Sequence, residues 1–378
     1  MLLEGLIERL GEDWALTAAG AGIGLAFGFL AQRSRFCLRS AVIEFSRNIT
    51  GGRLTVWLFA FSVALLATQA MTLLGWFDAS GARQIATRGS LSGAAVGGAL
   101  FGVGMILARG CSSRLLVLAA QGNLRSVISG LVFAVTAQAS WTGALSPLRE
   151  AIAQGWTVDG GAARDLTMRL GFGHEGGLIF GAVWLLAAIV WARRQRVPAW
   201  GWAGASGVGL CIAAAWWATY AVSRVAFDPH PIQALSFTGP STEVLTRVLF
   251  ATDKPPTFDL GLVPGVFLGS FLAAWLYREL KLEGFQGGPS MTRYMLGAVC
   301  MGFGGMLAGG CAVGAGLSGA AVFTITSWVT LSAIWAAAAL TDRLVDSREL
   351  ITQDQPIPGP GAVPAPASTP REGVLPTR

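Results

Sequence analysis

Residues 97–114 read GGALFGVGMILARGCSSR, and residues 297–314 read GAVCMGFGGMLAGGCAVG. The two stretches align without a gap at a constant offset of 200 residues. Their identical positions include Leu-Ala-x-Gly-Cys, which ends at Cys111 in one copy and at Cys311 in the other. Matching apolar segments that stop at the same motif indicate an internal repeat. We expect an apolar helix to break at each Gly-Cys and a second helical segment to follow.

The rest of the chain has the composition of a membrane protein. Of its 378 residues, 53% are hydrophobic and only 13% are charged, whereas soluble domains carry roughly 25% charge. Apolar blocks near the 20 residues that span about 30 Å of hydrocarbon predict an all-α polytopic membrane protein. We expect about nine transmembrane helices, at 15–32, 54–76, 89–108, 126–145, 177–192, 200–222, 260–277, 291–308 and 323–341.

Positive charges predict the orientation of these helices. With the N-terminus outside, 18 of the 27 Lys and Arg residues fall in cytoplasmic segments, as the positive-inside rule requires. This rule explains the net charge of +6 better than nucleic-acid binding does, so we expect no nucleic-acid partner. We predict a multi-pass protein of the bacterial inner membrane, in contact with the lipid bilayer, with a periplasmic N-terminus and a cytoplasmic C-terminus.

This orientation makes the repeat an inverted one, because the helix before Cys111 then runs inward and the helix before Cys311 runs outward. Inverted repeats with broken helices are an architecture of many transporters. The predicted organisation is a first repeat with the N-terminal segment (1–145), a connecting loop and linking helix (146–199), and a second, inverted repeat (200–342). The Pro-rich residues 343–378 cannot bury a core, and we expect them to be a disordered tail.

The break itself predicts an anion site. The first backbone N–H groups of a helix that starts after the break lack partners within the helix and favour an anion. Gly110 and Gly310 abut the break, where backbone freedom is needed. Two pockets that each combine N–H donors with a thiol suit a small anion that has a soft atom. Transport of such an anion is our leading interpretation.

Other cysteines and arginines are candidates of different strength. Cys37 lies among basic residues, either as an inner station of the path or as a thiol in an ordinary basic loop. Cys211 and Cys300 fit core positions, since a buried cysteine behaves as a small hydrophobe. Arginines near Cys111 either face the path or extend to the lipid headgroups. Arg109 ends a helix, which favours the headgroups, whereas Arg114 follows the break, which favours the path. Arg125 is a weaker candidate for the path.

Three motifs together resemble those of the YeeE/YedE family of sulfur-compound transporters. They are QRSRFCLR at 32–39, RGCSSR at 109–114 followed by GNLRS at 122–126, and AGGCAVGAGLSG at 308–319. The resemblance covers roughly residues 15–341. It implies a nine-helix, hourglass-like inverted-repeat fold that imports thiosulfate or a related sulfur anion. It further implies that Cys37, Cys111 and Cys311 line the substrate path.

One position departs from the family pattern. Members often carry Gly-His after the last cysteine, but here Ala315 follows Gly314, so the substrate or the last station can differ. A cytoplasmic sulfur-carrier protein is a candidate partner. We expect no cofactor, no bound metal and no enzymatic activity. Two alternatives remain: a membrane thiol enzyme that forms a persulfide on Cys111, and a copper transporter that uses Met291, Met295, Met301 and Met306.

Overall fold

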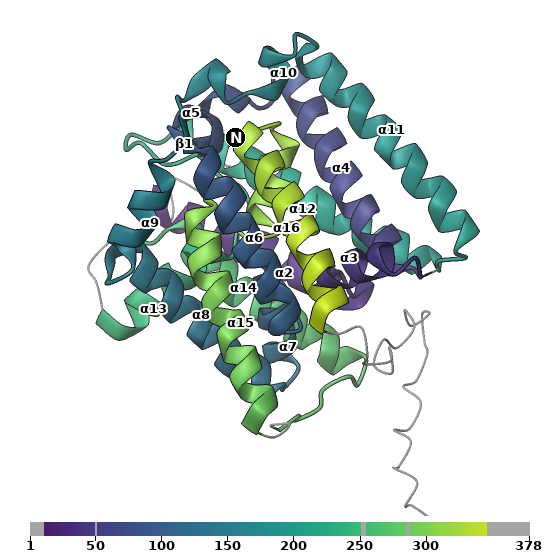
Figure 1. The fold of residues 1–378 in the computed structure, drawn as a ribbon. Coiled ribbons are helices and arrows are strands. Elements are labelled where there is room, and N and C mark those ends of the chain that lie inside the picture. The colour runs from purple at the N-terminus through teal and green to yellow at the C-terminus, as the bar shows by residue number, and fades with distance from the viewer. Residues whose placement is uncertain (1–10, 50, 251–254, 285–287, 346–378) are drawn as a thin grey trace, which may run out of the picture.

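The computed structural model describes residues 11–49, 51–250, 255–284 and 288–345. Helices dominate this part of the chain, which confirms the all-α prediction (Figure 1). Nine helices in this part of the chain are 17 to 25 residues long, and each overlaps one of the nine predicted segments. They are α2 (Glu12–Ser34), α4 (Arg53–Leu73), α6 (Leu91–Leu107), α8 (Leu124–Thr142), α11 (Gly173–Arg194), α12 (Ala199–Ser223), α14 (Phe258–Leu276), α15 (Gly288–Leu307) and α16 (Ile325–Val345).

Six stretches of the described chain are long and apolar enough to cross a membrane. They are 12–46, 53–73, 91–120, 173–194, 199–223 and 258–276. A seventh is added if α8 and the short helix after it, which are bent by 68°, count as one span. The remaining long helices are more polar, and α16 carries Asp342 and Arg343 near its end. Nine crossings therefore stay a prediction. α16 extends to Val345, beyond the predicted start of the tail, and residues 346–378 lie outside the described residues.

Short elements join the long helices, and most of them were not expected from the sequence. Two were expected, as the helical segments that follow the breaks: α7 (Ser112–Ala120) and a π-helix (Gly314–Gly319). The others are α3 (Leu38–Ser46), α5 (Arg83–Ala86), α9 (Ser146–Ala153), α10 (Leu166–Arg169), α13 (Thr238–Phe250), two 3-10 turns (Ala79–Gly81, Gly161–Ala163) and a two-residue antiparallel ladder of β1 (Gly89–Ser90) with β2 (Thr157–Val158).

Helices α6 and α15 cross with their backbones in contact, because glycine faces glycine at the crossing. A Cβ atom on Gly97 would lie 2.5 Å from the Ala308 nitrogen, and one on Gly297 would lie 2.5 Å from the Ala108 nitrogen. Low numbers on one helix meet high numbers on the other, so the two helices are antiparallel. The small residues shared by the repeat thus create its central contact, as small residues do between membrane helices.

A second close contact joins α2 and α14. Glycines spaced by four residues on each helix face backbone atoms of the other: Gly20, Gly24 and Gly28 on α2, and Gly261, Gly265 and Gly269 on α14. Residue numbers rise together along the two helices, so this pair is parallel. Ser270 also donates a hydrogen bond to the Gly28 carbonyl, at 3.1 Å. Close packing of the two helix backbones explains why glycine occurs at these six positions.

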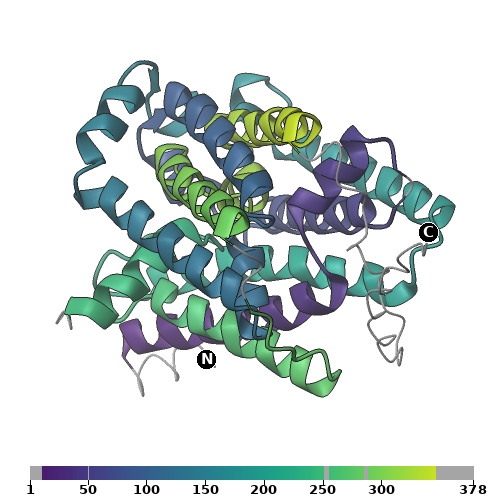
Figure 2. The same cartoon turned by 60° about the horizontal axis from the view of Figure 1, so that its bottom comes forward.

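Helix contacts are duplicated at the same 200-residue offset. α6 packs on α16, and α15 packs on α8; α2 packs on α14, and α12 packs on α4. The short helices follow the same rule, since α3 contacts α4 and α16 while α13 contacts α14 and α8. Figures 1 and 2 show α6, α15 and α16 side by side. Helix α11 has no counterpart at this offset, and its main partner is α4.

Candidate functional site: two helix breaks and their thiols

The first break separates α6 from α7. The backbone N–H of Arg109 donates to the Ile106 carbonyl (3.2 Å), and that of Gly110 donates to the Met105 carbonyl (3.1 Å). Arg109 itself has φ 55°, in the left-handed region. This hydrogen-bond pattern, with one left-handed residue, is the Schellman end of a helix. The break is therefore a defined turn and satisfies carbonyls at the end of α6.

The second break, after α15, repeats this turn. The Gly310 N–H donates to the Gly305 carbonyl (2.9 Å), and Gly309 takes the left-handed conformation with φ 77°. The prediction that Gly110 and Gly310 supply backbone freedom was wrong by one residue, because the positive φ angles belong to Arg109 and Gly309. Gly310 is still needed for space, since a Cβ there would lie 2.9 Å from the Ala315 nitrogen. Gly110 has ordinary clearance.

Each repeated cysteine stands at the start of the segment after its break. The Leu115 N–H donates to the Cys111 carbonyl (2.9 Å), and the Ala315 N–H donates to the Cys311 carbonyl (2.8 Å). The thiols face the same backbone groups: the Arg114 N–H interacts with the Cys111 sulfur, and the Gly314 N–H donates to the Cys311 sulfur at 3.4 Å. Backbone N–H groups and a thiol thus lie together at each break, and a pocket for an anion there stays a prediction.

The thiols of Cys37 and Cys111 meet. Cys37 precedes α3, Cys111 precedes α7, and the side chains of the two cysteines lie close enough to interact. Both are almost completely buried, at 7% and 1% exposed. The Cys111 sulfur also lies 3.3 Å from the hydroxyl of Ser113. Ser112, buried beside it, has no hydrogen-bond partner for its hydroxyl in the described residues. Segments separated by 74 residues thus form one thiol pair, Cys37 with Cys111.

Positive charge surrounds the thiol pair unevenly. The guanidinium groups of Arg114 and Arg39 act electrostatically on Cys37, and Arg114 also acts on Arg35. Arg114 lies in the first turn of α7, so its backbone and its side chain both serve the pair. Of the three predicted path arginines, Arg114 is the one that the structure brings to the thiols. The arrangement offers an anion both charge and N–H donors.

Arg109 and Arg125 gather elsewhere, on Tyr294 at the start of α15. Their guanidinium carbons lie 6.0 Å and 4.7 Å from the centre of the Tyr294 ring. Arg125 also donates to the Ala108 carbonyl at the end of α6, at 3.5 Å. This position satisfies the negative end of a helix. The two arginines therefore lie against the first break, and the charge of Arg39 acts both on Arg125 and on Cys37.

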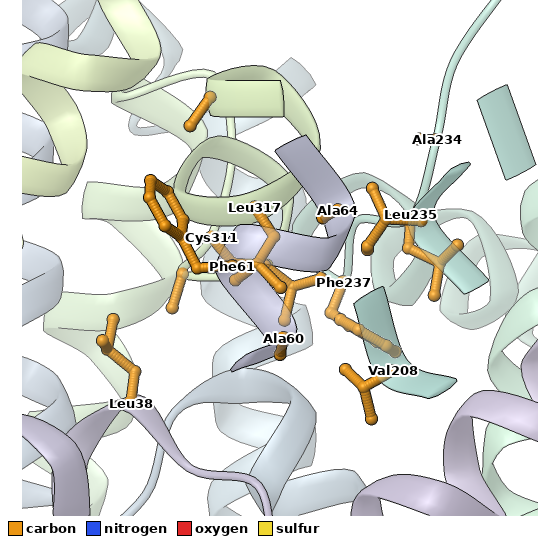
Figure 3. Packing of buried hydrophobic residues seen from close by; sticks show 14 of the residues in the cluster. Leu38, Ala60, Phe61, Ala64, Val208, Ala234, Leu235, Phe237, Cys311 and Leu317 are labelled. Carbon is orange, nitrogen blue, oxygen red and sulfur yellow. The ribbon is translucent and has the colours of Figure 1, made fainter. Parts of the chain in front are cut away.

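Cys311 has different surroundings. It is completely buried among apolar side chains, and Figure 3 shows Leu317, Phe61 and Phe237 in the same packed region. At the 200-residue offset, Phe237 takes the place of Cys37, so the second break has one thiol instead of two. Cys211 was expected in the core and is 7% exposed within α12, whereas Cys300, expected there too, is only half-buried on α15.

Sequence reasoning missed Tyr294 and Glu279, which contact the arginines of the site. Neither residue is near a cysteine motif, and neither has an identical residue at the repeat offset. A weak signal was available for Glu279, an acidic residue in the basic segment that follows a predicted helix. Among the described residues, His, Cys, Asp and Glu form no group of three that could hold a metal ion.

The family model for sulphur transport matches residues 33–340 and so includes both breaks and the thiol pair. The chain belongs to this family. It is similar to the thiosulfate transporter TsuA of Escherichia coli strain K12, with 25% identity over 354 residues, 86% of this chain and 95% of the relative. It is also similar to the TsuA of Spirochaeta thermophila, with 26% identity over 326 residues, 82% of this chain and 93% of the relative.

Membership of the sulphur transport family confirms the resemblance that the three cysteine motifs indicated. Cys37, Cys111 and Cys311 all fall within the matched range. Most of the length of each relative is covered, so the likeness concerns the whole membrane domain. A sulphur transport protein with helices of this length is a multi-pass membrane protein.

Proposed function

We propose that this protein is a transporter, not an enzyme, and that it imports thiosulfate or a related small sulfur anion across the inner membrane. Cys37, Cys111 and Cys311 line the path, and Arg114 offers positive charge at the thiol pair. The observation that carries the proposal is the meeting of Cys37 and Cys111 at a helix break, beside an arginine. The names of the two relatives supply the substrate class.

The chemistry of the break suits this substrate. A dianion that enters a narrow apolar passage loses hydration, and that loss is costly unless donors replace the water. Backbone N–H groups at the break can bind the oxygens of the anion. A thiol is a weak donor and a soft group, matched to the terminal sulfur of thiosulfate. Such contacts hold the anion and still let it leave, which conduction requires.

The orientation of the two halves belongs to the same proposal. Residues 1–145 and 200–342 form the two repeats, inverted with respect to each other, as the antiparallel α6 and α15 support. Four helices are followed by an arginine whose backbone has the left-handed conformation. These residues are Arg35 after α2, Arg109 after α6, Arg196 after α11 and Arg278 after α14. In the proposed orientation all four point inward, in line with the positive-inside rule. The ends of α4 and α15, which point outward, have Gly75 and Gly309 instead.

Uptake by the purified protein in liposomes tests the function. Labelled thiosulfate should accumulate with time, and sulfate, which lacks the soft terminal sulfur, should compete poorly. A Cys111→Ala protein should insert normally and take up nothing above empty liposomes. Equal uptake of sulfate and thiosulfate would reject the proposed substrate. Absence of uptake by the wild-type protein would reject the proposed transport.

A further inference from the structure

Glu279 joins three side chains at the edge of the thiol-pair region. It lies three residues beyond the end of α14. Its carboxylate accepts a hydrogen bond from the Gln32 amide at 2.8 Å, and it pairs with Arg33 at 3.4 Å. A looser contact of 3.9 Å reaches the guanidinium of Arg35. Since the side chain of Glu279 is only 15% exposed, these charges interact with little screening by water.

The two arginines are held differently. The guanidinium of Arg33 lies 3.4 Å from the centre of the Tyr277 ring and is 2% exposed, so it is fixed on two sides. Arg35 is 19% exposed, and its ion pair among the described residues is the 3.9 Å contact to Glu279. Its neighbours in charge are otherwise cations, namely Arg53, Arg114 and Arg33. Repulsion by these arginines opposes the weak attraction of Glu279, so an anion can compete with this carboxylate for Arg35.

Arg114 connects this arrangement to the thiols. Its charge acts on Arg35 and also on Cys37, two residues further along the chain from Arg35. An anion at the thiol pair therefore lies near both guanidinium groups. Glu44, the acid on α3, is bound to the first N–H groups of α4, at Arg53 (3.0 Å) and Leu54 (2.8 Å). Among the described residues, Glu279 is the acid paired with Arg35.

The site related to this one by the repeat lacks the whole network. At the repeat offset, Leu235 replaces Arg35 and Gly314 replaces Arg114. The turn after α4 matches the turn after α14 and has Trp76 in place of Glu279. The arginines and their acid are thus present together at one site and absent together at the other. This association is expected if the acid serves the arginines, since the fold alone does not need it at the second site.

We propose that Glu279 is a positioning residue that holds Arg35 in the empty station and competes with the incoming anion for it. The inference rests on the proposed transport of a sulfur anion. Binding by Arg35 and Arg114 without a competitor would be tight, and a tightly bound ion leaves slowly. The carboxylate of Glu279 pairs with Arg35 again when the anion leaves the thiol pair. It therefore weakens binding and speeds release toward the cytoplasm.

Kinetics of Glu279→Gln test this role. Glutamine keeps the size and the hydrogen bond to Gln32 but removes the charge. Initial rates of labelled thiosulfate uptake in liposomes should give a KM about fivefold lower, the change produced by about 1 kcal/mol of charge interaction, together with a lower maximal rate. Glu279→Asp, which keeps the charge, should restore most of the wild-type behaviour.

Glu283→Gln is the matched control. Glu283 lies in the same segment and accepts a hydrogen bond from Asn123 instead of pairing with an arginine. It should leave KM unchanged. A Glu279→Gln protein with a wild-type KM, or with a higher one, would overturn the inference, because the acid would then be structural or would orient Arg35 for binding.

Calorimetry with thiosulfate and the detergent-solubilised protein separates this inference from the proposed function. Tighter binding to Glu279→Gln than to wild type, without any uptake, would reject transport but support the role of Glu279. Equal binding to both proteins, with normal uptake by the wild type, would reject the role of Glu279 alone.

Discussion

Arg109 and Gly309 occupy the same position at the ends of α6 and α15, and both have a left-handed backbone, with φ 55° and φ 77°. Glycine adopts this conformation without strain, whereas another L-residue loses roughly 1–2 kcal/mol. The break beside the thiol pair therefore has a strained backbone at Arg109, where the other break has an unstrained glycine. The strain makes Arg109 a candidate for function through its guanidinium, which lies on Tyr294.

Replacement of Arg109 by glycine should separate function from folding. Arg109→Gly removes the backbone strain, so its thermal midpoint should equal or exceed that of the wild type, while thiosulfate uptake falls severalfold. Arg196→Gly is the control, because Arg196 has the same left-handed backbone (φ 50°) at the end of α11. It relieves the same strain, so its thermal midpoint should also equal or exceed that of the wild type, but its uptake should not change. If Arg109→Gly transports like the wild type, the guanidinium has no role in transport.

The sequence could predict the long helices because an apolar block has a length and ends that are visible without neighbours. Positions of all nine were close to those observed, for example 260–277 against Phe258–Leu276. Short elements such as α3 and α13 were not predictable, since they are amphipathic and are held by tertiary contacts. Glu44 on α3 binds the start of α4, and Glu243 on α13 accepts a hydrogen bond from Thr257, the N-cap of α14.

The site was predicted where the repeat marked it and missed where contacts join distant segments. An exact match at Cys111 and Cys311 was enough to place both breaks. It could not place Cys37 against Cys111, because that contact depends on how α3 and α7 start. Its place after the break favoured Arg114, which interacts with the thiols, but spacing could not place Arg109 and Arg125 on Tyr294. Side-chain direction at a turn follows from backbone dihedrals that residue type does not reveal.

The antiparallel contact of α6 with α15 should be intolerant of even one methyl group. Gly97→Ala would place a carbon 2.5 Å from the Ala308 nitrogen, and overpacking of this kind costs about 1–3 kcal/mol. A lower thermal midpoint in detergent is the expected result. Gly130→Ala on α8 is the control, since nothing lies within 4 Å of the added carbon; alanine should be neutral or stabilising there. Equal midpoints for the two variants would contradict the observed packing.

Reporter fusions should place the two ends of the chain on opposite sides of the membrane. A phosphatase active only in the periplasm should be active when fused before Gly5 and inactive after Val345. A fluorescent protein that folds in the cytoplasm should give the reverse pattern. The expectation rests on positive charge at the helix ends that point inward. This charge comes from the four arginines with a left-handed backbone and from the basic residues around Cys37. Both ends on one side would require an even number of crossings and would remove the inverted repeat.

Cys111 gives the sharpest test of the proposed path, because its thiol meets Cys37, Ser113 and the N–H of Arg114. Serine is smaller and forms stronger hydrogen bonds, so it cannot offer the soft, weak contact that suits a terminal sulfur atom. We expect Cys111→Ser to abolish thiosulfate uptake while insertion and thermal midpoint stay near wild type. Cys211→Ala, which removes a small apolar contact within α12, should transport normally.

In the wild type, thiol alkylation should block uptake, and thiosulfate should slow the alkylation. Wild-type rates in Cys111→Ser would show that sulfur at this position has no role and would leave a general anion passage in place of the proposed one.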